Sequence, residues 1–95
     1  MTCLRWSESA QHGLLAVHDR IAGIDDAAAL RLKERILSTV SRLADHPTMG
    51  RPGRLRGTRE VDVEPTLYVV AYRNIGETVE VLSLLHDYRP WPRRA

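Results

Sequence analysis

The chain has 95 residues, which is enough for one domain over residues 1–95 and leaves no room for a second. Its 43% hydrophobic and 27% charged residues are those of an ordinary globular protein, and a net charge of +2 excludes a histone-like charge density. No signal segment opens the chain, and no run approaches 18 apolar residues. We therefore expect a cytoplasmic protein without membrane contact.

A short strand over Cys3–Trp6 opens the predicted order of elements, and Ser7 follows it as a helix cap. The apolar positions of the first helix recur at spacings of four, three and four residues, which is one helical stripe. They are Ala10, Leu14, Val17 and Ile21. Gly23 is expected to end this helix. Cys3 is expected to be a small core residue, and a lone cysteine fits a reducing compartment.

A second helix is predicted between Asp25-Asp26, which supply a cap and a favourable charge, and Pro47. Its apolar arc covers nearly half the circumference, more than packing on one surface requires. The arc consists of Ala29, Leu32, Ile36, Val40 and Leu43, widened by Leu30, Leu37 and Ala44. We therefore expect two contacts, one with a sheet and one with a partner. Lys33 lies inside the arc, where its stem can cover apolar surface.

Three further strands are predicted after a Gly/Pro-rich loop over residues 48–57. They cover residues 58–64, 67–73 and 78–85, with a hairpin turn at 74–77. The order β-α-α-β-β-β predicts an α+β fold, in which an N-terminal helical hairpin packs on one face of an antiparallel sheet. The first strand is expected at an edge or beside the last strand. Residues 86–95 form a tail broken by Pro90 and Pro92.

Positive charge is concentrated in the second half of the chain. No acidic residue occurs between His46 and Arg59, a stretch that contains four arginines. They are Arg51, Arg54, Arg56 and Arg59. One interpretation is a basic surface that attracts phosphates or an acidic protein segment. The other is a solvated loop that keeps the protein soluble.

His86 ends the last predicted strand, and Arg89 follows three residues later. A histidine near arginines and near Tyr72 or Tyr88 has the groups for RNA cleavage, in which a base takes the 2′-hydroxyl proton and a cation steadies the phosphate. The alternative is a strand-end histidine bonded to backbone. The His and Cys positions show no metal-ligand spacing, so we expect no metal and no cofactor. Trp91, between two prolines, is a rigid anchor for the sheet or for a partner.

Four motifs in chain order resemble the ParE branch of the RelE/ParE toxin superfamily. They are P-x-x-G-R at 47–51, G-T-R-E at 57–60, Y-x-x-x-Y-R at 68–73 and L-H-x-x-R-x-W-P at 85–92. The resemblance implies a toxin of a type II toxin-antitoxin system. Its antitoxin reaches operator DNA through an N-terminal part and wraps the toxin with a C-terminal segment. A toxin dimer within that complex is a further expectation.

ParE-type toxins are associated with poisoning DNA gyrase, so the first hypothesis is a non-enzymatic gyrase inhibitor. Its target-binding residues are expected to be Arg59, Arg73, His86, Arg89 and Trp91. Its antitoxin-binding residues are expected to be Leu30, Lys33, Leu37, Val40 and Ala44. The absence of the lysine-rich set of the RelE branch favours this hypothesis.

RelE-type toxins cut mRNA in the ribosome, so the second hypothesis is a metal-independent endoribonuclease. Its acid-base group is His86 or Tyr88, and Arg89 and Arg59 hold the phosphate. Tyr88 resembles the aromatic acid-base group of that branch. In ParE sequences a small residue such as Gly or Ala is expected shortly after the position of His86, whereas Asp87 and Tyr88 follow it here. The third hypothesis is a degenerate toxin that is retained only as an antitoxin-binding module or co-repressor.

Overall fold

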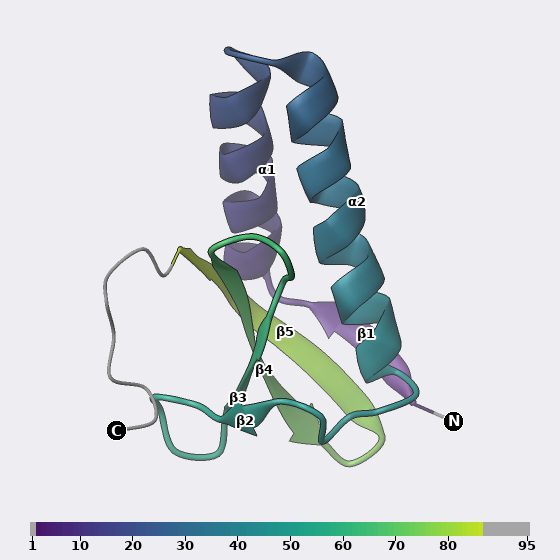
Figure 1. The fold of residues 1–95 in the computed structure, drawn as a ribbon. Helices are drawn as coiled ribbons and strands as arrows, with labels where there is room; N and C mark the ends of the chain where they lie inside the picture. The colour runs from purple at the N-terminus through teal and green to yellow at the C-terminus, as the bar shows by residue number, and fades with distance from the viewer. Residues whose placement is uncertain (1, 87–95) are drawn as a thin grey trace, which may run out of the picture.

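A computed structural model describes residues 2–86 of the chain. The elements are β1 (Cys3–Trp6), α1 (Glu8–Ala22), α2 (Asp26–Leu43), β2 (Arg51–Pro52), β3 (Arg59–Asp62), β4 (Tyr68–Ile75) and β5 (Thr78–His86). The two helices form a hairpin that packs on one face of a five-stranded sheet, and the tip of the hairpin extends beyond the sheet (Figure 1). The predicted α+β class and the helical hairpin are confirmed.

The helix ends follow from local side-chain chemistry. The Ser7 hydroxyl accepts a hydrogen bond from the Ala10 N–H at 3.0 Å and donates one to the Leu82 carbonyl at 2.9 Å, which fixes the start of α1 against β5. Asp25 caps α2 by accepting from the Ala28 N–H at 3.1 Å. Both predicted caps are confirmed, whereas α2 ends at Leu43, before the predicted stop at Pro47. Neither helix in residues 2–86 is long and apolar enough to cross a bilayer.

The sheet has the strand order β1-β5-β4-β3-β2 and is mixed, which corrects the antiparallel prediction. β1 lies at the edge beside β5 and runs parallel to it, whereas the other pairs are antiparallel. Apolar alternation reveals the faces of a strand but not its direction in the sheet, so the sequence pattern leaves this undecided. The loop over 48–57 also contains β2, whose two residues pair with β3.

A register shift in the central pair β4–β5 decides which side chains reach the core. Ala71 lies opposite Ser83 and Tyr72 opposite Val81, so Leu82 is the extra residue of a β-bulge. Because of this extra residue, Val81 and Leu84 both pack on the helix side although they are three positions apart, an offset that would place them on opposite faces of a regular strand.

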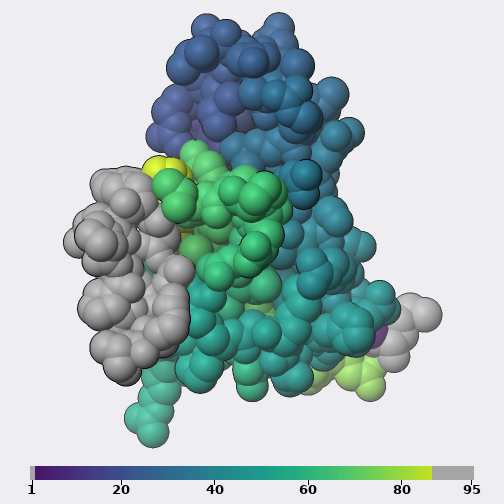
Figure 2. Space-filling model, in the orientation of Figure 1, coloured from purple at the N-terminus to yellow at the C-terminus, as the bar shows by residue number. Residues whose placement is uncertain are grey.

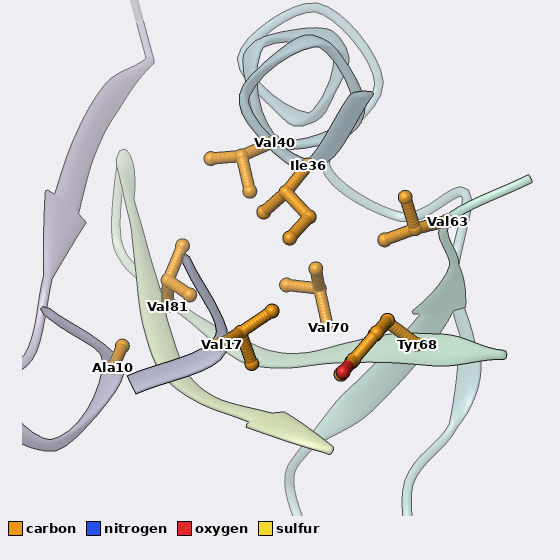
Figure 3. Close-up of a cluster of buried hydrophobic side chains, with 8 residues drawn as sticks. All are labelled: Ala10, Val17, Ile36, Val40, Val63, Tyr68, Val70 and Val81. Atoms are coloured by element: carbon orange, nitrogen blue, oxygen red, sulfur yellow. The ribbon is translucent and has the colours of Figure 1, made fainter. Parts of the chain in front are cut away.

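The core lies between α2 and the two central strands. Ile36 and Val40 point from α2 toward Val70 and Val81 of the sheet (Figure 3), and all four side chains are buried. Val40 therefore packs in the core and does not face a partner, which corrects its assignment to the antitoxin surface. Cys3 is exposed on the edge strand, so its expected place in the core is also wrong.

We expect Ile36→Asp or Val40→Asp to unfold the protein or to lower its melting temperature by more than about 10 °C. Truncating a buried Ile costs about 2–5 kcal/mol, and an unpaired buried carboxyl group adds to that cost. In a domain of this size about 1 kcal/mol corresponds to 4–8 °C. Circular dichroism melts measure the change. Leu30→Asp, at an exposed site on the same helix, is the matched control. If the core variants melted at the same temperature as Leu30→Asp, the helix stripe that contains Ile36 and Val40 would have to be exposed to solvent.

Candidate functional site

The hydroxyl group of Tyr72 joins the sheet to the loop that follows α2. Tyr72 is fully buried, and its hydroxyl donates to the Pro47 carbonyl at 2.9 Å and accepts from the Gly50 N–H at 3.0 Å. A buried hydroxyl that lacked such partners would be costly, and these two bonds satisfy it. Tyr72 therefore fixes the path of the loop over residues 47–50.

Gly50 and Arg59 hold the same loop from the other side. A Cβ on Gly50 would lie 2.8 Å from both the Glu60 carbonyl oxygen and the Tyr72 hydroxyl, so only glycine permits this close approach. The Nη1 group of Arg59 donates to the Gly50 carbonyl at 2.8 Å and to the Thr48 carbonyl at 3.3 Å. Arg59, predicted to contact the target or a phosphate, is thus bonded to the protein's own backbone.

The buried carboxylate of Glu60 draws in two of the four loop arginines. Glu60 is 4% exposed, and its Oε2 atom lies 3.1 Å from both the Nε and the backbone N of Arg54. Arg51 approaches its Oε1 atom at 3.5 Å and reaches Asp62 at 3.1 Å. A buried carboxylate requires such partners. The charge of Arg51 and Arg54 is therefore largely compensated, and Arg56 is exposed.

A second buried carboxylate, Glu80, holds Arg73 and Arg5 across three neighbouring strands. Arg73 donates through Nε and Nη2 to the Oε1 atom of Glu80, both at 2.8 Å, and Arg5 lies 3.4 Å from Oε2. Charge-assisted pairs of this length are among the stronger hydrogen bonds in proteins. Glu80 and Glu60 alternate with core-facing valines, so both lie on the sheet face away from the helices. Arg73 is consequently held in one orientation on that face.

His86 lies beside Tyr68 and not beside Tyr72, which corrects the predicted cluster. The rings of His86 and Tyr68 are 4.7 Å apart between centroids, and the Tyr68 hydroxyl accepts from Nη2 of Arg20 at 2.8 Å. In the sheet register His86 faces Tyr68, whereas Arg59 faces Tyr72. Four residues along β4 separate these positions by roughly 13 Å.

Tyr88, predicted as an acid-base group, and Arg89 and Trp91, predicted to bind the target, fall outside the described residues 2–86. The second predicted surface, for the antitoxin, lies on α2. Leu30 and Leu37 are 53% and 41% exposed, Lys33 is exposed and Ala44 is half-buried. Within residues 2–86, His, Cys, Asp and Glu side chains form no group of three or more that could hold a metal ion.

Comparison with known proteins identifies the family of the chain. A family model described as ParE toxin of type II toxin-antitoxin system, parDE, matches residues 4–91. The chain is 37% identical over 90 residues to "Putative toxin Y4kP" of Sinorhizobium fredii (strain NBRC 101917 / NGR234), covering 95% of this chain and 93% of that protein.

Two solved structures share the fold. A chain of the chromosomal ParDE TA system from P. aeruginosa has a TM-score of 0.83 at 23% identity, covering 92% of this chain and 97% of that one. A chain of the intact E. coli RelBE toxin-antitoxin complex has a TM-score of 0.67 at 14% identity, covering 94% and 100%. At these identities the likeness concerns the fold alone.

We expect Tyr72→Phe to lower the free energy of unfolding by about 1–3 kcal/mol, because the Gly50 N–H and the Pro47 carbonyl both lose a buried partner. Chemical denaturation measures this loss. Tyr68→Phe, which removes only a partly buried bond to Arg20, is the control and should cost less. Equal stability of Tyr72→Phe and the parent protein would contradict the role assigned to this hydroxyl.

Proposed function

Because the chain belongs to the ParE toxin family of type II toxin-antitoxin systems, we propose that it inhibits DNA gyrase by binding, without covalent chemistry, and that a cognate antitoxin holds it inactive. The observation that carries the first part is the separation of His86 from Arg59. His86 and Arg59, the two described residues of the expected ribonuclease site, do not lie next to each other.

Both residues are committed to contacts that a nuclease site would have to break. Arg59 donates to the carbonyls of Thr48 and Gly50, and these bonds hold the loop over residues 47–50. The ring of His86 packs on Tyr68, the first residue of β4, which is four residues from the Tyr72 that Arg59 faces. An acid-base group has to lie within about 3 Å of the proton that it moves, and a phosphate-binding cation has to lie nearby. This arrangement supports a binding function better than RNA cleavage.

Arg73 is the best described candidate for contact with the target. It lies on the sheet face away from the helices, and Glu80 fixes its guanidinium group while about half of the side chain stays exposed. A pre-ordered side chain loses less conformational entropy on binding than a free one. Arg89 and Trp91, beyond the described residues, complete the proposed surface.

The outer side of α2 is the proposed antitoxin-binding surface. Leu30 and Leu37 expose apolar area seven residues apart on one side of the helix, with Lys33 between them. An amphipathic partner segment would bury such a stripe. The solved structures named as the ParDE system and the RelBE complex are toxin-antitoxin systems, which supports an antitoxin as the partner.

Induced expression without antitoxin tests the target. We expect plasmid DNA to become relaxed or cleaved while message stays intact, and purified toxin to inhibit gyrase supercoiling in vitro. Cleaved message with normal plasmid topology would contradict the gyrase proposal. The variant Tyr88→Phe is then informative, since it should keep full toxicity if no acid-base chemistry occurs, whereas His86→Ala would also remove an expected target contact. Absence of toxicity with tight antitoxin binding would instead support a degenerate toxin.

We expect Leu30→Asp combined with Leu37→Asp to weaken antitoxin binding at least tenfold, because two charges enter an apolar contact. Titration calorimetry with the antitoxin's C-terminal segment measures the affinity. Arg56→Asp, at an exposed loop position, is the control for a change of charge. Unchanged affinity of the double variant, with an unchanged melting curve, would move the antitoxin to another surface.

A further inference from the structure

A polar groove lies between α2 and the connection from β3 to β4. It has a volume of about 300 Å³. Its lining consists of Arg31, Glu34, Arg35, Ser38, Thr39, Arg42 and Glu64. In Figure 2 the β3–β4 connection, in green, lies against the side of the helical hairpin. No apolar residue lines this groove.

The three groove arginines share one side of α2. Successive helical residues are about 100° apart, so Arg31, Arg35 and Arg42 fall within roughly 40° of one another. They extend over 11 residues, which is about 16 Å along the helix. All three side chains are exposed. The groove therefore presents a linear row of guanidinium groups.

These arginines differ from those on the sheet because no carboxylate among the described residues pairs with them. Arg35 donates only to the backbone carbonyl of Glu64, at 3.4 Å, and Arg42 contacts only the sulfur of Met49, at 4.0 Å. Glu34 and Glu64 line the groove and reduce its charge to a formal +1, but neither forms an ion pair with the arginines. The positive charge of the row is thus available to a ligand.

We propose that this groove binds the phosphate backbone of duplex DNA. Arginine guanidinium groups and Ser hydroxyls are among the side chains that contact phosphates, and the exposed Ser38 lies between Arg35 and Arg42. A row of about 16 Å spans several phosphates of one strand, which rise about 3.4 Å each along the duplex axis.

The polar lining favours nucleic acid over a protein segment. Protein interfaces have an apolar centre, whereas DNA interfaces are polar and positive. The apolar stripe that suits a protein partner, Leu30 and Leu37, lies roughly 120° around α2 from the arginine row. An antitoxin on that stripe leaves the groove open.

This inference deepens the proposed function, because DNA is the substrate of gyrase, yet the binding itself does not require gyrase. The toxin would hold the DNA through α2 while the far sheet face contacts the enzyme. The two ideas therefore fail separately in a test that uses the toxin and DNA alone.

The test is fluorescence anisotropy of a labelled 20-base-pair duplex with the purified full chain between 50 and 200 mM salt. We expect Arg31→Gln, Arg35→Gln and Arg42→Gln each to weaken binding by roughly three- to fivefold. Each should also reduce the slope of log affinity against log salt by about 0.9. Arg56→Gln removes the same charge from an exposed loop and should change affinity less than twofold.

A change of opposite sign sharpens the test. Glu34→Gln removes a negative charge from the groove and should tighten binding, whereas Glu8→Gln, on α1, should not. Circular dichroism melts exclude unfolding of each variant. Equal losses in Arg35→Gln and Arg56→Gln, or no binding of the parent chain at 50 mM salt, would overturn the proposal.

Two further measurements distinguish duplex DNA from other ligands of the groove. Tighter binding of single-stranded RNA than of the duplex, or displacement of the duplex by poly-glutamate at equal charge concentration, would contradict the choice of DNA. Capture of gyrase by the toxin without DNA should be unaffected by Arg35→Gln. If neither the parent chain nor any variant captured gyrase, the gyrase proposal would be refuted while the DNA-binding proposal would stand.

Discussion

The buried hydroxyl of Tyr72 is the interaction on which the arrangement of the rest depends. It has one proton to donate and lone pairs to accept, and it uses them on Pro47 and Gly50. This fixes the loop after α2, whose carbonyls then bind Arg59. The sequence motifs at 47–51, 57–60 and 68–73 thus contact one another through these bonds. Their joint occurrence is explained by the packing of this loop and does not require a catalytic role.

The two buried glutamates extend this constraint to the surface charge. Glu60 and Glu80 each hold two arginines, so Arg5, Arg51, Arg54 and Arg73 are fixed and compensated. The arginines of α2 have no such partners among the described residues. A net charge of +2 therefore conceals two classes of arginine, which sequence composition counts alike.

Local signals predicted the helices and the order of elements along the chain better than they predicted the direction of the first strand in the sheet or the neighbours of the site residues. Ser7 and Asp25 act through neighbours three residues away, so their roles can be read from the sequence. The neighbour of His86 is set by strand register, and the bulge at Ala71 and Tyr72 shifts that register by one residue. Acids flanked by valines, as at Glu80, were the available sign of a buried ion pair, and the sequence interpretation missed it.

The apolar arc of α2 is wide because it combines a side that packs on the sheet with a side that remains exposed. Ile36 packs on the sheet, Leu30 and Leu37 remain exposed, and the arginine row borders the polar groove. The arc is wide because the core side and the exposed stripe adjoin each other, which counting apolar positions cannot separate. Only burial assigns Val40 to the first and Leu37 to the second. The arginine row lies on a third side of α2, apart from the core side and the exposed leucine stripe. A partner bound to the leucine stripe therefore leaves the charge of the arginines accessible, and α2 can contact two partners of different chemistry.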